Sequence, residues 1–316
     1  MTLRVTFLGT GGAVPTTERN PSALLVNREG DRLLFDCGEG TQRQLMHFGA
    51  GFDVSHLFVT HLHGDHVYGI PGFLETLDFN DREGPLTIHV PPGTKGKVRS
   101  FLESLGGRPS FPLRLSEARP GTVALRREDA GSTPYEVRAF EVDHRTNAVG
   151  YVLVEDDRKG RFDRERAEAL GVPVGPKFST LHEGEAVELD DGTTVEPEQV
   201  VGEARPGRTV VYTGDTRPQE RTVEVAEQAD LLIHDATFAD DRAERARRTA
   251  HSTAREAGEI AARADVKRLA LTHISSRYAH DVSAHETEAK AAFDGEAFVP
   301  DDGAVFEVPF PDAGAR

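Results

Sequence analysis

The segment His61-x-His63-x-Asp65-His66 places four side chains that can bind metal within six residues. In an extended chain alternate residues point the same way, so His61 and His63 can bind one ion. Asp65 and His66 follow Gly64, where the chain can turn sharply, and would face a second ion nearby. Imidazole and carboxylate together suit zinc, and less exclusively manganese or iron. The spacing therefore predicts a site for two metal ions.

A six-residue motif cannot complete two metal sites, so further ligands are expected downstream. His144 follows a predicted strand at 137–142, and His273 follows another at 268–271. Asp215 comes directly after a strand at 209–212 and Thr213-Gly214, where its carboxylate could bridge both ions. A single histidine at a strand end is often structural, so the prediction depends on the whole set.

The elements that must position these residues are short apolar strands alternating with helices. Strands are predicted at 3–8, 22–26, 32–35, 56–60, 86–90, 137–142, 149–154, 209–212, 231–233, 268–271 and 305–308. Helices are predicted at 42–48, 73–77, 94–105, 284–293 and 241–264, the last with a break near 251–253. This pattern is typical of an α/β fold with mixed strands, in which ligand-binding groups gather at strand ends.

The composition restricts the class of protein. The chain of 316 residues has 53 acidic and 37 basic side chains, a net charge of −16, and only six lysines among the basic residues. This balance is typical of proteins from a salt-rich cytoplasm, although a GC-rich genome would also favour arginine over lysine. A single cysteine excludes a disulfide framework, and no apolar run of about 18 residues or signal-peptide pattern is present. We expect a cytoplasmic protein with no membrane partner.

One segment differs in charge from the rest of the chain. Residues 157–180 carry six basic and four acidic side chains and end in a stretch rich in glycine and proline. The segment follows an apparently complete strand, so we interpret it as an insertion that projects from the core. An ordinary solvated loop is the alternative.

Several longer motifs surround these candidate residues, and together they resemble one family. The His-x-His-x-Asp-His motif alone is typical of the metallo-β-lactamase superfamily, whose metals lie at the edge of an αββα sandwich. The longer blocks resemble the ribonuclease Z family of tRNA 3′ processing endonucleases. These blocks are FLGTGGAVPTTERNPS, LLFDCGEGTQRQ, VTHLHGDHVYGIPGFLET, YTGDTRP, LLIHDATF, AHSTAREAGEIA and LTHISSRY. The segment GRFDRERAEALGVPVGPKFSTLHEGE resembles the flexible arm with which that family grips the tRNA elbow.

The resemblance implies a fold, a cofactor and a ligand set. It implies one metallo-β-lactamase domain over 1–316, with a flexible tRNA-binding arm inserted at 155–184. It also implies two Zn²⁺ per chain, with Mn²⁺ as the other candidate. One zinc would be bound by His61, His63, His144 and Asp215, and the other by Asp65, His66, His273 and the bridging Asp215. Asp36 would support the metal-binding loop.

The resemblance further implies roles in the reaction. Asp65 would accept the proton of the attacking water, and His251 would protonate the leaving ribose oxygen. Asp235 would orient His251, at a position where the family usually has glutamate. Arg277 would contact phosphate. Within the arm, the expected substrate contacts are Arg158, Lys159, Arg161 and Lys177.

These expectations lead to one preferred function and two alternatives. The preferred function is a homodimeric endoribonuclease that cleaves precursor tRNA, leaving a 3′-hydroxyl on the tRNA and a 5′-phosphate on the trailer. The first alternative is another hydrolase of the same fold, acting on a small phosphodiester, thioester or lactam, which would not need a basic arm. The second is a non-catalytic RNA-binding protein, against which the intact set of seven ligands argues.

Overall fold

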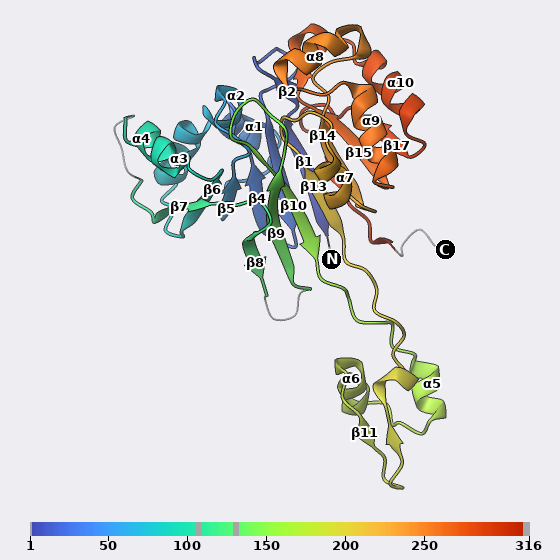
Figure 1. Ribbon diagram of the computed structural model, residues 1–316. Helices are drawn as coiled ribbons and strands as arrows, with labels where there is room; N and C mark the ends of the chain where they lie inside the picture. The colour runs from blue at the N-terminus through green and yellow to red at the C-terminus, as the bar shows by residue number, and fades with distance from the viewer. Residues whose placement is uncertain (1, 105–108, 129–132, 312–316) are drawn as a thin grey trace. The chain divides into compact units, whose positions relative to one another are not determined.

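The chain forms two compact units. The computed structural model describes residues 2–104, 109–128 and 133–311 (Figure 1). The larger unit comprises Met1–Arg127, Tyr135–Val154 and Arg208–Pro309. The smaller unit comprises Glu128–Pro134, Glu155–Gly207 and Phe310–Arg316. In terms of internal packing the chain thus has a main body and a smaller folded part.

Two seven-stranded sheets form the centre of the larger unit. The first has the order β18 (Val305–Glu307), β1 (Leu3–Gly9), β3 (Ala23–Arg28), β4 (Asp31–Phe35), β5 (His56–Phe58), β6 (Leu86–Val90), β7 (Leu113–Glu117). The second has the order β17 (Glu296–Phe298), β15 (Arg268–Thr272), β14 (Leu231–Asp235), β13 (Thr209–Tyr212), β10 (Val149–Glu155), β9 (Tyr135–Glu141), β8 (Val123–Arg127). Their inner faces share one apolar core, to which Phe7 and Tyr151 belong.

Helices cover the outer face of each sheet. A second apolar cluster joins the first sheet to α1 (Thr41–His47), α3 (Ile70–Phe79) and α4 (Lys95–Ser104). A third joins the other sheet to α9 (Ala254–Arg263) and α10 (Ser283–Ala292). Figure 1 shows these layers on either side of the paired sheets. The predicted αββα sandwich is thereby confirmed.

Burial on both faces explains why the central strands could be recognised from sequence. Along β3, Leu24 and Val26 face the core between the sheets, while Leu25 faces the helical layer. A strand that buries both faces is apolar at consecutive positions and does not alternate with polar residues. These continuous runs are the pattern from which the strands are predicted.

The helix predicted at 241–264 breaks where expected. It consists of α8 (Ala243–Thr249) and α9, with His251 in the linker between them. Thr253 begins α9 with a capping box, since its hydroxyl accepts a bond from the Glu256 amide and its own amide donates to the Glu256 carboxylate. The break leaves His251 outside both helices.

None of the helices in the described ranges is both long and apolar enough to span a bilayer.

The smaller unit is inserted between two neighbouring strands. Strands β10 and β13 pair in antiparallel fashion, with Val154 opposite Thr209, and the chain between them forms α5 (Arg164–Ala169), α6 (Pro176–Glu183), β11 (Val187–Glu188) and β12 (Thr194–Val195). The central segment of this unit is Glu155–Gly207, which includes the arm predicted at 155–184. Its small core explains the longer extent, because Val187, Val195 and Val200 pack with Leu181.

Candidate metal and catalytic centre

The predicted ligands meet at one edge of the paired sheets. His61 and His63 follow β5, His144 follows β9, Asp215 follows β13 and His273 follows β15. Their ligand atoms fall into groups whose members all lie within 4.8 Å of one another. Residues 212 positions apart in the chain thus form one cluster, as expected for strand ends in an α/β fold.

The first group contains three imidazoles and a carboxylate. His61 Nε2 lies 2.9 Å from His63 Nδ1 and 3.4 Å from Asp215 Oδ2. His144 Nε2 lies 3.4 Å from His63 Nδ1 and 3.8 Å from the same Asp215 oxygen. Four nitrogen and oxygen atoms that converge in this way form a donor set that zinc accepts.

The second group lies on the other side of the same carboxylate. His273 Nε2 lies 3.1 Å from Asp65 Oδ2 and 3.3 Å from Asp215 Oδ1. His66 Nε2 lies 3.7 Å from the Asp65 carboxylate and 3.3 Å from Asp215 Oδ1. Asp215 therefore presents Oδ2 to the first group and Oδ1 to the second, which is the arrangement of a bridging ligand.

Two buried atoms of this cluster point to bound cations. His66 Nε2 and Asp215 Oδ1 have no hydrogen-bond partner among the described residues, although both side chains are almost fully buried. A buried polar atom without a partner costs about 1–3 kcal/mol, so such atoms are uncommon unless a ligand engages them. The residues present therefore fit a pair of divalent metal ions.

The histidines predicted as ligands are held by hydrogen bonds at their other ring nitrogen. Nδ1 of His61 lies 3.0 Å from the Thr60 hydroxyl, and Nδ1 of His273 lies 2.8 Å from the Thr237 hydroxyl. His144 Nδ1 lies 2.9 Å from the carbonyl oxygen of Ala250. Such contacts fix the orientation of each ring and the nitrogen that faces the metal.

Asp36 supports His66 from a fully buried position. Its carboxylate lies 2.7 Å from His66 Nδ1 and accepts bonds from the Thr60 amide, the Thr60 hydroxyl and the Tyr212 hydroxyl. Tyr212 comes from the opposite sheet, so this contact ties the two halves of the sandwich together beneath the metal cluster. Sequence reasoning identified Asp36 but missed Thr60 and Tyr212, whose only signal was their position beside ligand motifs.

The histidines of the cluster shift the pKa values of its two carboxylic acids, Asp65 and Asp215. Burial opposes ionisation of Asp65, but the hydrogen bond from His273 and the nearby His66 outweigh it and lower the pKa of Asp65. Burial likewise opposes ionisation of Asp215, and the surrounding histidines reverse the effect, so its pKa falls well below the usual range. Both carboxylates are therefore ionised and available as ligands at neutral pH.

His251 and Asp235 form a pair at the margin of the cluster. Their closest atoms, His251 Nδ1 and Asp235 Oδ2, lie 2.8 Å apart, so the shorter aspartate reaches the imidazole. Burial would lower the pKa of His251, but the adjacent carboxylate outweighs burial and raises this pKa to about 9. The Asp235 carboxylate also accepts bonds from the amides of Thr216 and Thr237, which fix its orientation. The pair can hold a proton close to the metal ligands.

The glycine-rich loop after β1 passes close to the second ligand group. A Cβ atom added to Gly12 would lie 2.5 Å from His273 Nδ1, so only glycine fits there. The next residue, Ala13, donates its amide to Asp65 Oδ2 over 2.7 Å. The loop thus positions the predicted ligand Asp65 through its backbone.

The predicted substrate contacts differ in their accessibility. Arg277 lies exposed in the short turn Ser276–Tyr278, where its guanidinium donates to the Ser275 hydroxyl. In the smaller unit Lys159 and Arg161 are exposed. Two other arm residues make contacts inside the unit. The Arg158 guanidinium lies 3.6 Å from the centre of the Phe310 ring, and Lys177 Nζ donates to the Glu188 carbonyl.

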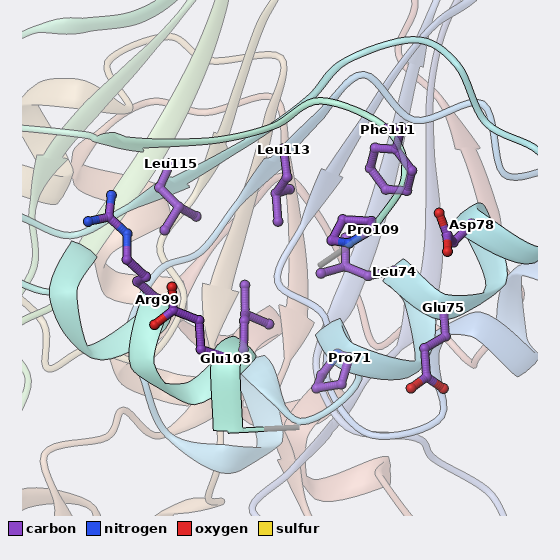
Figure 2. A pocket seen from close by; sticks show the side chains of 11 residues that line it. Pro71, Leu74, Glu75, Asp78, Arg99, Glu103, Pro109, Phe111, Leu113 and Leu115 are labelled. Atoms are coloured by element: carbon purple, nitrogen blue, oxygen red, sulfur yellow. The ribbon is translucent and has the colours of Figure 1, made fainter. Parts of the chain in front are cut away.

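A separate groove in the larger unit contains none of these residues. It has a volume of about 650 Å³ and lies between α3, α4 and β7, with Leu74, Phe111 and Leu113 among its apolar lining and Glu75 and Asp78 on α3 (Figure 2). None of the described residues that line the groove is a histidine, so it does not resemble the cluster of predicted metal ligands.

Comparison with known proteins gives a consistent result. The model of the metallo-β-lactamase superfamily matches residues 16–273. A ribonuclease Z of Halorubrum lacusprofundi is 68% identical over 313 residues, with 99% of each chain covered. A ribonuclease Z of Haloferax volcanii is 65% identical, with 99% of this chain and 97% of that protein covered. The crystal structure of the short form of human tRNase Z has 28% identity and a TM-score of 0.68, covering 97% of this chain and all of that one.

Proposed function

The chain belongs to the ribonuclease Z family of the metallo-β-lactamase superfamily, and on this premise we propose that it is an endoribonuclease removing the 3′ trailer from precursor tRNA. The products are a tRNA with a 3′-hydroxyl and a trailer with a 5′-phosphate. The observation that carries the proposal is the two-sided Asp215, whose oxygens face two complete groups of ligands. Such a centre is suited to hydrolysis of a phosphodiester bond.

The cofactor we propose is a pair of zinc ions. His61, His63 and His144 would hold one ion, Asp65, His66 and His273 the other, with Asp215 shared between them. Bound divalent ions at such a centre lower the pKa of water and neutralise charge on a phosphate oxygen. The predominance of imidazole supports zinc over magnesium, and manganese is the competing ion.

The residues of the chain then divide the proton transfers between them. Asp65 accepts the proton of the attacking water as the new bond to phosphorus forms. His251 donates a proton to the ribose 3′-oxygen as the bond from that oxygen to phosphorus breaks. Asp235 keeps the imidazole protonated and oriented, which the raised pKa of His251 supports. The exposed Arg277 binds a phosphate of the substrate.

The remaining parts of the proposal concern the partners of the enzyme. The insertion 155–207 would bind the tRNA, with the exposed Lys159 and Arg161 contacting phosphates. We propose that the enzyme acts as a homodimer in the cytoplasm, as the family resemblance implies. The basic half of the insertion supports the assignment to tRNA binding.

The direct test is cleavage of one 3′-extended precursor tRNA with the product ends mapped. We expect cleavage directly after the discriminator base, abolished by a chelator and restored by added zinc. Asp65→Ala should lose activity by a factor of about 10² or more because it removes both a ligand and the proton acceptor. An absence of cleavage by protein that holds about two metal ions would instead favour a small-molecule hydrolase.

A further inference from the structure

One arginine connects three loops of the catalytic centre. Arg217 lies two residues after the bridging Asp215, and its amide donates to the carbonyl of Asp143, the neighbour of ligand His144. The preceding residue, Thr216, accepts a bond from the Asp143 amide and donates its own amide to Asp235. The backbone of 216–217 therefore ties the His144 loop to the Asp235 strand.

The side chain of Arg217 extends this connection to His251. Its Nη1 lies 2.5 Å from the carbonyl oxygen of His251. The same guanidinium forms a two-point ion pair with Glu256, at 2.7 and 2.6 Å. Both side chains are mostly buried, with 17% and 18% of their surfaces exposed. The ion pair with Glu256 of α9 fixes the guanidinium of Arg217 in place. From that position its Nη1 atom also holds the backbone carbonyl of His251.

The carbonyl that Arg217 holds belongs to a strained turn. Ala250, directly before His251, has a φ of 58°, in the left-handed region that costs a non-glycine residue about 1 kcal/mol or more. The Ala250 carbonyl is also the acceptor for the ring of His144. Such a turn persists only where its surroundings hold it in place. Arg217 holds the turn by donating a hydrogen bond to the His251 carbonyl. On the other side of the residue, the His251 amide donates a hydrogen bond to the Ala246 carbonyl.

We propose that Arg217, braced by Glu256, is a positioning residue that aims the His251 imidazole at the leaving 3′-oxygen. The inference rests on the proposed role of His251 as proton donor. Asp235 engages Nδ1 and sets the rotation of the ring, so Nε2 is the nitrogen that donates. Arg217 sets the position of the backbone from which the ring extends. Its guanidinium is committed to these contacts, so it acts through His251 and does not bind substrate phosphate.

The chemistry of the leaving group gives a test specific for this role. When the scissile 3′-oxygen is replaced by sulfur, a thiolate leaves, and its conjugate acid has a pKa near 8.5, so no proton donor is needed. The experiment compares oxygen-linked and 3′-sulfur-linked precursor RNA under single-turnover conditions. Full-length wild type, Arg217→Gln and His251→Ala are each measured on both substrates.

We expect Arg217→Gln to slow cleavage of the oxygen substrate about 10²-fold, the loss that a misplacement of roughly 1 Å produces. His251→Ala should lose about 10²- to 10⁴-fold. On the sulfur substrate both variants should return to nearly the wild-type rate. Rescue of His251→Ala without rescue of Arg217→Gln overturns the inference, because it shows that Arg217 acts on the metal ligands or on folding. No rescue of His251→Ala overturns the proposed proton donor itself.

Two further variants keep the test decisive. Glu256→Gln preserves the capping interaction at Thr253 but weakens the ion pair, and should show a smaller loss with the same rescue. It remains informative if Arg217→Gln does not fold. The matched control is Arg263→Gln, which removes an exposed arginine paired with Glu220 and should leave both rates unchanged. Equal losses by Glu256→Gln on the two substrates also contradict the inference.

Discussion

Replacing Tyr212 by phenylalanine isolates the contact that joins the two sheets beneath the metal cluster. The Tyr212 hydroxyl donates to Asp36 over 2.8 Å, and both residues are buried. Burial and the Asp36 carboxylate raise the pKa of Tyr212 well above its ordinary value, so the phenol keeps its proton and acts as donor. The substitution removes one oxygen atom, and Asp36 keeps its bonds from Thr60 and its contact with His66.

The expected loss has two parts. A hydrogen bond to a buried charge contributes about 1.5–3 kcal/mol, so the free energy of unfolding should fall by about 2 kcal/mol. In a body of this size that corresponds to a fall in Tm of roughly 4–8 °C. Asp36 also orients His66, and loss of such an outer partner costs about 10- to 100-fold in metal affinity. The stabilisation that added metal provides should therefore fall by about 1.4 kcal/mol for each tenfold change in affinity.

Tyr151→Phe is the matched control, because the Tyr151 hydroxyl is equally buried but donates to the neutral carbonyl of Val59. We expect it to lose about 1 kcal/mol and to retain its metal affinity. The measurements are thermal unfolding with and without chelator, and competition for zinc against a coloured chelator. If the two variants bind zinc equally well, Asp36 does not transmit the contact of Tyr212 to the metal cluster.

Three more predictions concern the insertion, the charge and the core. Val154 pairs with Thr209, so residues 155–207 can be replaced by a two-residue turn. This variant should cleave precursor tRNA about 10²-fold or more slowly but still hydrolyse a small aryl phosphodiester. Equal loss of both activities would contradict the assignment of the insertion to tRNA binding. Cleavage should persist or peak at molar salt because a chain of charge −16 repels RNA at low salt, and a rate that falls steadily from low salt would refute this. Burial lowers the pKa of His285 to about 4, so the unfolded chain binds a proton at this residue more readily than the folded one. The free energy of unfolding should therefore fall as pH drops from about 6.5 towards 4, by about 2 kcal/mol at pH 5. His285→Phe should remove that part of the acid sensitivity in denaturant titrations at pH 7.5 and 5.0.

The candidate site could be predicted from sequence because each ligand follows an apolar strand. The strand preceding Asp215 was predicted with the bounds that the structure has, 209–212, and the helix break placed His251 outside a helix. Within the two seven-stranded sheets three strands were not predicted, namely β7, β8 and β17, and all three lie at an edge of their sheet. An edge strand buries less of its surface, so charged residues interrupt its apolar pattern, as Arg126 and Arg127 do in β8.

The extent of the insertion could not be predicted from charge alone. The excess of basic side chains at 157–180 indicated an insertion there, but residues 155–207 together carry fourteen acidic and seven basic side chains. The later residues are needed because Val187, Val195 and Val200 complete a small core with Leu181. Charge indicated which half could contact RNA, whereas packing determined how much of the chain folds with it. The insertion as a whole is acidic, which adds to the reason for expecting activity at high salt.

Whether the Asp235 carboxylate reaches the His251 imidazole could not be predicted from the sequence. An aspartate side chain is one carbon shorter than the glutamate usual in the family, so its reach depends on where the backbones of both residues lie. The 2.8 Å contact is made because β14 extends to Asp235, while a left-handed residue at 250 and the contact from Arg217 bring His251 towards it. Three separate segments of the chain fix that separation together. A motif could therefore name both residues, but only the fold could show that the carboxylate reaches the imidazole.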